Sequence, residues 1–194
     1  MIDLRIEPLV HFVSQIVDFS AEELVIFKQI IKYERYKKGD FLIHTSKLND
    51  KLFFITKGIV RNLTIDEQGQ EFTYDFRAEG MVVSEHISFI NESLPVHCSQ
   101  CLSECEVIVI HKKDLDQFYQ VAKHGDRMGR ILYEQVIVDL VTDRIDRQTK
   151  SILQRFHELG NRFPKIYQRV PQHIIASYLG TSTVHLSRLK SQTN

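Results

Sequence analysis

The sequence predicts an α+β fold, in which an N-terminal antiparallel β-roll or jelly roll is followed by a long helix and a C-terminal helix-turn-helix. Three observations lead to this prediction. Glycines recur beside short runs rich in phenylalanine, isoleucine and valine. Further along the chain, β-branched residues recur every seven positions. Near the C-terminal end, two short segments with a helical pattern flank a single glycine. The expected division of the 194 residues is into residues 1–122, 123–147 and 148–194.

The composition indicates a folded chain with an uneven charge distribution. Lysine plus arginine and aspartate plus glutamate each number 25, and 43% of the residues are apolar, which is enough for a packed core. Residues 151–194 nevertheless contain six basic residues and one acidic residue, a net charge of +5, against −5 for residues 1–150. This asymmetry suggests an acidic body that carries a basic module for a polyanion.

Several classes of protein are disfavoured by the same sequence. No apolar run approaches the ~18 residues of a membrane span. The first residues are acidic where a signal peptide is basic and then apolar, and three cysteines are too few for a disulfide framework. We therefore expect a soluble cytoplasmic protein with no membrane partner. The sequence contains no Walker loop, G-x-S-x-G or Rossmann glycine pattern, so we do not expect an enzyme.

A short N-terminal helix is predicted by a capping box. The Ser20 side chain can accept a hydrogen bond from the backbone three residues later, and Glu23 can accept one from the Ser20 backbone. We expect this helix to begin near Ala21 and to end around Tyr33.

Residues 36–110 are predicted to form the β-roll. Four glycines recur at intervals of 11 to 19 residues, namely Gly39, Gly58, Gly69 and Gly80. The apolar runs beside them include residues 41–43, 52–55, 59–63 and 107–110. Residues 66–70 are typical of a hairpin loop with Gly69 in the left-handed conformation. Many short strands with regular turns indicate an antiparallel sandwich or barrel.

After Lys113 the apolar residues recur at the spacing of an α-helix. We expect one helix from Asp114 to about Ala122 and a long one from roughly Asp126 to Asp146. β-Branched residues on the long helix are spaced as in a parallel two-stranded coiled coil, and the expected dimer seam is Ile131, Val138, Val141 and Ile145. A second apolar stripe predicts that the helix is covered both by its own β-roll and by a second copy of the protein. A monomeric core helix is the alternative.

The basic C-terminal segment contains the most informative pattern. Residues 174–180 are typical of a short helix that stops at Gly180, and a second helix then starts with Ser182 as its N-cap. The expected core between the two helices is Ile175, Leu179, Leu186 and Leu189. In a helix-turn-helix the second helix enters the DNA major groove with its N-terminus first.

The exposed face of that second helix has side chains that suit double-stranded DNA. Hydroxyls and helix N-terminal amides can hold phosphate, Arg188 can pair with guanine, and Val184 can contact a thymine methyl group. The expected DNA-binding residues are Ser182, Thr183, Val184, His185, Ser187, Arg188 and Lys190. A helical hairpin that only packs is the structural alternative.

The order of these elements, and four segments within them, resemble the cyclic-AMP receptor / fumarate-nitrate regulator (Crp/Fnr) family of bacterial transcription regulators. The segments are Lys38–Leu42, Phe53–Arg61, Asp66–Glu71 and Arg169–Gly180, the last of which is similar to Bacteroidetes-type members. The resemblance covers essentially the full chain. It implies a homodimer that reads an inverted-repeat operator under the control of a small-molecule effector in the β-roll.

The resemblance also places the effector pocket. Members that bind cyclic nucleotides offer Gly-Glu to the ribose and an arginine to the cyclic phosphate, whereas here the pair aligns with Ser84-Glu85 and no lysine or arginine occurs from His86 to His111. Burying a charged phosphate without a cation is costly. We therefore expect that cyclic AMP is not bound in the usual way, and we predict no cofactor. The expected pocket residues are Ser84, Glu85, His97 and Cys98.

Other interpretations stay open beside this one. Cys98, Cys101 and Cys105 have a spacing that can hold a metal, but ordinary thiols are the preferred interpretation and no metal site is predicted. The alternative function is a cyclic-nucleotide, small-ligand or protein-interaction module that does not recognise DNA. Because Val184 stands where several relatives carry a base-reading glutamate, the operator sequence of relatives cannot be transferred to this chain.

Overall fold

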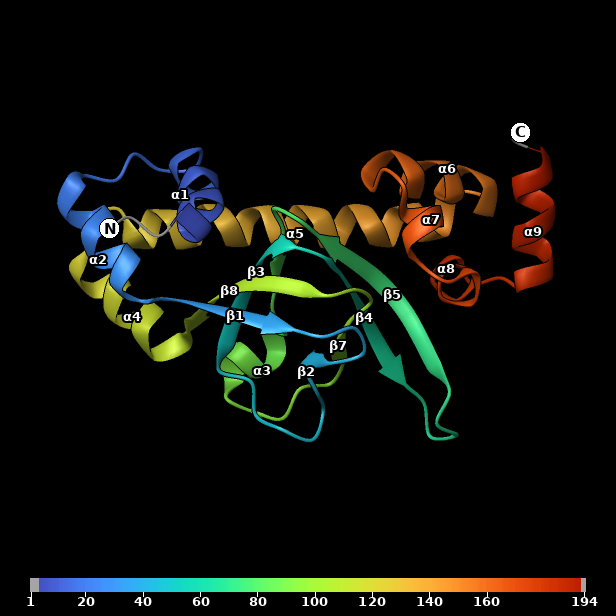
Figure 1. The fold of residues 1–194 in the computed structure, drawn as a ribbon, viewed down its shortest axis with the longest axis horizontal. Coiled ribbons are helices and arrows are strands. Elements are labelled where there is room, and N and C mark those ends of the chain that lie inside the picture. The colour runs from blue at the N-terminus through green and yellow to red at the C-terminus, as the bar shows by residue number, and fades with distance from the viewer. Residues whose placement is uncertain (1–3, 193–194) are drawn as a thin grey trace.

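The computed structural model describes residues 4–192, and the expected domain limits at residues 1 and 194 lie outside the described residues. Two antiparallel sheets form a β-roll, N-terminal helices cover one end of it, and a long helix extends past it to a group of C-terminal helices (Figure 1). The prediction of an α+β fold with an antiparallel β-roll followed by helices is therefore confirmed.

The N-terminal helices are the 3-10 helix η1 (Leu4–Ile6), α1 (Glu7–Ser14) and α2 (Ala21–Gln29). The predicted capping box at the start of α2 is present, with the Glu23 amide donating to Ser20 Oγ and the Ser20 amide donating to the Glu23 carboxylate. The predicted helix end near Tyr33 is wrong, because the residues after Ile30 pair with another strand as part of the sheet. Helix α1 is not predicted by the sequence pattern.

The two sheets contain four strands each. The first has the order β1 (Ile31–Tyr36), β8 (Cys105–His111), β3 (Lys51–Lys57) and β6 (Val82–Val83), and the second has the order β2 (Phe41–Ile43), β7 (Cys98–Cys101), β4 (Ile59–Ile65) and β5 (Glu71–Ala78). The predicted hairpin loop joins β4 to β5, and Gly69 within it has a φ of +81°, as expected for a left-handed residue. All pairings in these sheets are antiparallel.

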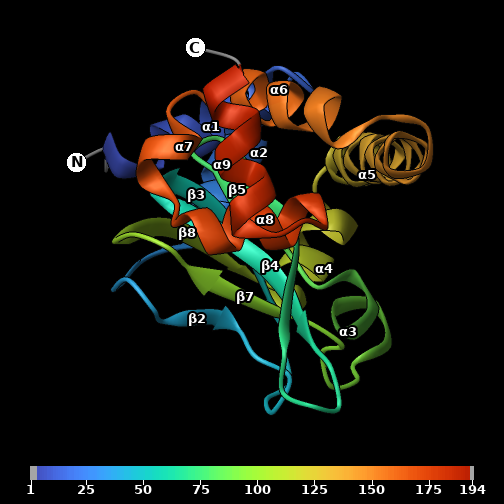
Figure 2. The same ribbon diagram turned by 90° about the vertical axis from the view of Figure 1, so that its right-hand side faces the viewer.

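The remaining helices are α3 (His86–Asn91), α4 (Lys112–Val121), α5 (Gly125–Thr149), α6 (Ile152–Arg162), α7 (Ile166–Arg169), α8 (Gln172–Leu179) and α9 (Thr183–Gln192). The long helix α5 lies beside the β-roll and is seen nearly end-on in Figure 2, with α6 to α9 grouped near its C-terminal end. Helices α4 and α5 therefore begin within two residues of the starts that the sequence predicts.

Three hydrophobic clusters hold these layers together. One lies inside the roll, and a second joins the sheet of β1, β8, β3 and β6 to the N-terminal helices, α4 and the start of α5. The third joins Phe76 of β5 to residues of the C-terminal helices, including Phe156, Ile175 and Leu186. The C-terminal helices therefore share a core with the roll.

Glu23 connects the N-terminal helices to the start of α5. Its carboxylate accepts hydrogen bonds from the backbone N–H of His124 at 2.7 Å and from the Ser20 amide at 2.9 Å, and it lies 3.0 Å from His124 Nδ1. Burial alone would raise the pKa of Glu23, but these hydrogen bonds outweigh burial and hold the pKa at about 2.

The variant Glu23→Ala is expected to lower the free energy of unfolding by roughly 2–4 kcal/mol, because it leaves buried donors without an acceptor. Urea titration near neutral pH measures this change. The matched variant Glu22→Ala removes an exposed carboxylate from the neighbouring position and is expected to change stability by no more than about 0.5 kcal/mol. Equal losses for the two variants would contradict the role given to Glu23.

Within residues 4–192, no helix combines the length and the apolar character that are needed to cross a membrane.

Candidate functional site

Helices α8 and α9 form a tight pair around a sharp turn. Gly180 ends α8 with a φ of +67°, a conformation that glycine adopts without strain. The next backbone N–H, from Thr181, donates to the Ala176 carbonyl, and Ser182 Oγ accepts from the His185 amide at 3.2 Å, so Ser182 is the N-cap of α9 as predicted. Each of the residues expected in the core of the pair is buried, namely Ile175, Leu179, Leu186 and Leu189.

The outer face of α9 brings together most of the residues expected to contact DNA. Six of them are exposed, namely Ser182, Thr183, Val184, His185, Ser187 and Arg188. Lys190 is half-buried, and its ammonium lies 5.4 Å from the centre of the Tyr167 ring. The exposed set combines hydroxyls, a histidine, a valine side chain and a guanidinium between the N-cap and the sixth residue of one helix.

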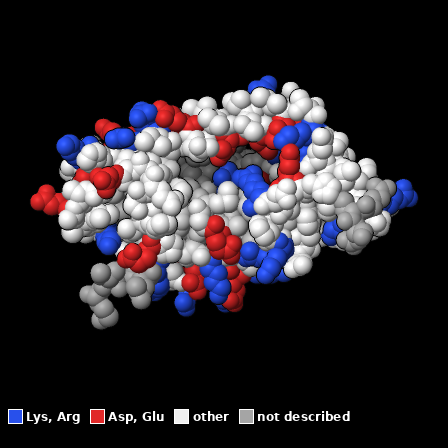
Figure 3. Space-filling model, turned by 90° about the horizontal axis from the view of Figure 1, so that it is seen from above, with Lys and Arg blue, Asp and Glu red and all other residues white. Residues whose placement is uncertain are grey.

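Several basic side chains of the C-terminal segment bond within the protein. Arg169 pairs with Glu79 at 2.9 Å, Arg162 lies 3.7 Å from the Asp75 carboxylate, and Arg155 donates to the Leu179 carbonyl. Acidic and basic side chains are interspersed over the face shown in Figure 3, and basic side chains lie in a hollow near its middle. The charge asymmetry of the sequence is therefore partly a complementarity between the C-terminal helices and the roll.

The middle of α5 carries an apolar stripe on its exposed surface. Three of the four expected seam residues, Val138, Val141 and Ile145, are more than half exposed, and Ile137 and Leu140 extend the same surface. Ile131 differs, because it is half-buried and packs against the cluster between α4, α5 and the N-terminal helices of its own chain. The apolar surface that is open for a partner therefore runs from Ile137 to Ile145.

A polar cluster lies where the resemblance places the effector. Glu85 is almost fully buried and caps α3 by accepting from the Ser88 amide at 2.6 Å, while its other oxygen lies 3.5 Å from His97 Nδ1. The His97 ring is also edge-on to Tyr74, with ring centres 5.2 Å apart. Ser84 Oγ and His97 Nε2 are buried and have no hydrogen-bond partner. The structure thus brings Glu85 and His97 together, whereas Ser84 lines a neighbouring cavity.

Cys98 is turned to a different neighbour. It is buried on β7 with Thr45 Oγ1 as its polar contact, at 3.9 Å. Cys101 and Cys105 are also buried and free. Across the described chain, no group of three or more His, Cys, Asp or Glu side chains is arranged to hold a metal ion.

Sequence reasoning missed two residues of the polar cluster, Tyr74 and Arg77, which reach it from β5. Arg77 contributes positive charge near His86, although its guanidinium is bonded to Asp75 at 2.7 Å. The sequence gives no signal for this pair, because residues three apart face opposite sides of a regular strand and the register of β5 shifts at Tyr74. The lack of lysine and arginine from His86 to His111 therefore does not make this region free of positive charge.

The two histidines of this region resist protonation. Burial lowers the pKa of His86, with a further contribution from Arg77, and burial lowers the pKa of His97 against the opposing effect of Glu85. His97 is thus uncharged near neutral pH. An anionic ligand finds no free cation in the described cluster.

Acidification is expected to destabilise the protein through these histidines. Because their folded-state pKa values lie below the ordinary 6.5, the unfolded chain binds more protons below that pH, and stability falls as the pH is lowered through 6.5. Urea midpoints at about pH 7.5 and about pH 5.5 measure the loss. The variant H86N/H97N is expected to show a smaller loss than the wild type, whereas the exposed-site control His157→Asn keeps the wild-type loss. An unchanged loss in H86N/H97N would contradict this assignment.

Comparisons with known proteins agree with this architecture. Residues 33–121 match the family model described as the cyclic nucleotide-binding domain. A comparison with curated protein sequences finds no match. None of the matches indicates a catalytic family.

Three solved structures show how far the similarity extends. FixK2 from Bradyrhizobium japonicum has a TM-score of 0.69 at 15% identity over 84% of each chain. The c-di-GMP responsive global regulator CLP of Xanthomonas campestris has a TM-score of 0.66 at 17% identity over 90% of this chain and 91% of that one. The regulatory subunit of a cAMP-independent protein kinase A from Trypanosoma brucei has a TM-score of 0.54 at 16% identity, over 68% of this chain and 47% of that one. Residues 33–121 therefore have the fold of a cyclic nucleotide-binding domain, and the similarity to the two bacterial structures extends into the helices that follow the β-roll.

Proposed function

We propose that this protein is a dimeric, sequence-specific DNA-binding transcription regulator whose β-roll is a sensor domain. Residues 1–122 form the sensor, residues 123–147 the dimerisation helix and residues 148–194 the DNA-binding helix-turn-helix. We also place the protein in the cytoplasm, because its three buried cysteines are all free thiols. A Bacteroidetes-type subclass rests on residues 169–180 alone.

The observation that carries the proposal is the outer face of α9. A helix whose buried side holds Leu186 and Leu189, and whose outer side exposes hydroxyls and Arg188, is preorganised for a groove lined by phosphates. Its N-terminal amides and Ser182 lie at the leading end, where the helix dipole favours phosphate. Arg188 follows on the same face, within reach of base edges.

The dimer is supported by the exposed stripe on α5. An apolar surface from Ile137 to Ile145 on a solvent-facing helix is unfavourable for a monomer and typical of an interface. A parallel pair of α5 helices joined along this stripe carries two copies of α9 on one side of the assembly. Two recognition helices related by a two-fold axis fit an inverted-repeat operator.

Coverage by the solved structures favours the regulator over a sensor without DNA recognition. Two bacterial proteins, one of them a global regulator, match over 84–90% of this chain, so the similarity includes the helices after the roll. The kinase regulatory subunit matches 68% of it. That shorter match is the observation behind the second candidate, a ligand-binding or protein-interaction module that does not bind DNA.

DNA binding is tested with duplexes selected from a random-sequence library on the full-length protein. The logarithm of the affinity for the selected duplex is expected to fall linearly with the logarithm of salt, with a slope of about −4 or steeper, because each neutralised phosphate contributes about −0.9. Fluorescence anisotropy at several salt concentrations measures the slope. Failure to enrich any sequence, at any ionic strength, would favour the second candidate.

A further inference from the structure

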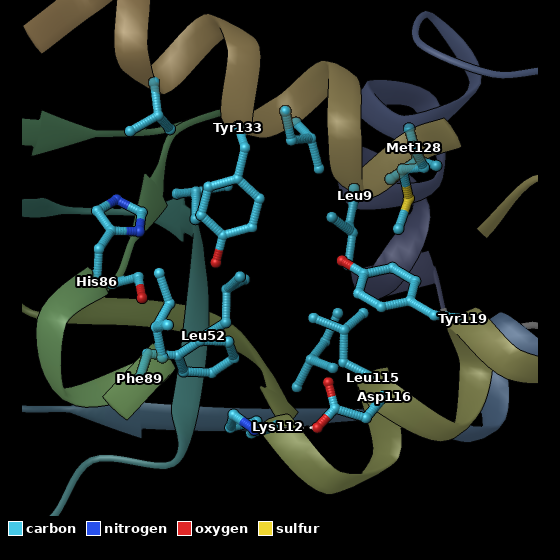
Figure 4. A pocket seen from close by; sticks show the side chains of 18 of the residues that line it. Leu9, Leu52, His86, Phe89, Lys112, Leu115, Asp116, Tyr119, Met128 and Tyr133 are labelled. Carbon is cyan, nitrogen blue, oxygen red and sulfur yellow. Dashed lines mark hydrogen bonds and ion pairs between the residues drawn. The ribbon is translucent and has the colours of Figure 1, made fainter. Parts of the chain in front are cut away.

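We propose that the cavity between the β-roll and the first half of α5 is the effector site, and that it binds an uncharged, largely apolar small molecule. The binding site is inferred independently of the function proposed above, whereas its role as an effector site rests on that function. The cavity lies on the side of α3 that faces α4 and α5 (Figure 4), and its lining includes Ser84 and His86, the sequence neighbours of Glu85.

The cavity has the size and the walls of a small-molecule site. Its volume is about 300 Å³, at the lower end of the range for such sites. Side chains from the sheet and from helices α1 to α5 line it, including Leu52 and Ile110 from the sheet, Phe89 from α3, Leu115 from α4, and Leu132 and Val136 from α5. An apolar body that leaves water for this space gains about 25 cal/mol per Å² of surface buried.

Several polar groups face the cavity, and two of them have no hydrogen-bond partner among the described residues. Ser84 Oγ and His86 Nδ1 are buried, line or flank the space, and have no hydrogen-bond partner. The hydroxyls of Tyr119 and Tyr133 point into it (Figure 4). Unpartnered buried polar atoms are rare in native proteins, so two of them in one wall indicate a ligand with one or two polar groups.

The charges around the cavity favour a neutral ligand. The ion pair of Lys112 and Asp116, 3.1 Å apart, lies at one side, and Lys112 is also bonded to Glu92. Burial raises the pKa values of Tyr119 and Tyr133 and lowers that of His86, so these three groups are uncharged near neutral pH. A carboxylate or phosphate would meet Asp116 and find no unpaired cation among the residues that line the space.

The position of the cavity links it to the dimer. Leu132, Tyr133 and Val136 contact the cavity, and the exposed apolar stripe begins at the next residue of the same helix. At Gly129 the helix lies so close to Tyr119 that an added Cβ would stand 3.0 Å from the ring. A ligand that fills the cavity therefore acts on the packing of α5 against the roll, and through α5 on the angle between the two DNA-binding heads.

The test uses 2-naphthol, which is uncharged at neutral pH and fluorescent, and whose signal is read without interference because the chain contains no tryptophan. Saturable binding to the full-length protein is expected at roughly 10–100 µM. The matched anion 2-naphthoate and cyclic AMP are each expected to bind at least about tenfold more weakly, because both carry a charge into the cavity.

Two variants of α3 locate the bound probe. Ile90 lines the cavity, while Ile87 is on the same helix, is similarly exposed at 51% against 57%, and does not line it. Ile90→Asp is expected to weaken 2-naphthol binding at least about tenfold by adding a charge to the apolar wall. Ile87→Asp is expected to leave it within about twofold. Circular dichroism on both variants confirms that they are folded.

The outcomes separate the inference from the proposed function. Saturable 2-naphthol binding that Ile90→Asp weakens, together with altered affinity for the selected duplex, supports the whole proposal. The same binding without any DNA recognition supports the site and overturns its role as an effector site together with the proposed function. DNA recognition with no saturable 2-naphthol binding, with equal binding by both variants, or with preference for 2-naphthoate overturns the inference.

Discussion

Replacing Val138 and Val141 with aspartate is expected to convert the protein from a dimer to a monomer and to abolish detectable binding to the selected duplex. Both side chains are more than half exposed in the single chain and lie at the centre of the apolar stripe on α5. In the dimer each substitution places two carboxylates in an apolar seam, and burying unpaired charge costs about 3–5 kcal/mol where it has been measured. We expect the dimer dissociation constant to rise at least about a hundredfold.

Sedimentation velocity across a range of protein concentrations measures this change. The matched control is Val25→Asp on α2, which replaces the same residue type at a similar exposure, 58% against 56% for Val138, outside the stripe. That control is expected to remain dimeric. A wild-type protein that sediments as a monomer, or a V138D/V141D variant that stays dimeric, would show that α5 is not the seam.

The variant Arg188→Ala is expected to weaken binding to the selected duplex by about tenfold or more and to leave the dimer intact. A bidentate pair between a guanidinium and guanine contributes about 1–3 kcal/mol of discrimination, and the dimer presents two copies. Arg188 is exposed on α9, and truncating it removes no buried contact, so the fold is expected to be unchanged. The variant is also expected to relax the sequence preference at the base pair that Arg188 contacts.

Fluorescence anisotropy with the selected duplex and with a scrambled duplex separates the contribution of Arg188 to base recognition from its contribution to sequence-independent attraction to phosphate. The matched control is Arg127→Ala, which removes an exposed helical arginine at the far end of α5 from α9. This control is expected to change affinity by less than about twofold, since charges beyond a Debye length of about 10 Å are screened. If Arg127→Ala weakens binding as much as Arg188→Ala does, the α9 face is not the site of base recognition.

Much of the fold could be predicted from local patterns. The capping box at Ser20, the hairpin at Gly69 and the turn at Gly180 each depend on a few neighbouring residues, and the structure contains all three. Helix α1 and the correct end of α2 could not be predicted in this way. Residues 31–33 join β1 because they pair with β8, which is more than 70 positions later in the chain, and long-range pairing of this kind leaves no local signal.

The candidate sites were predictable to different degrees. The exposed face of α9 follows from the helical period, since every third or fourth residue is apolar and the others point outward. The effector region was harder, because Tyr74 and Arg77 reach it from β5 and the cavity is lined by residues from six separate parts of the chain. A linear pattern does not show which distant side chains share one space.

By itself the sequence determined the order of the elements, the glycine turns, the apolar period of α5 and the polar face of α9, because each of these depends on residues within a few turns of one another. The tertiary structure alone decided that Ile131 packs inward while Val138 faces outward, that Arg162 and Arg169 pair with Asp75 and Glu79 of the roll, and that unpartnered Ser84 and His86 meet an apolar cavity. These outcomes depend on which surfaces the fold brings into contact, and burial and charge pairing are properties of those contacts rather than of any one segment.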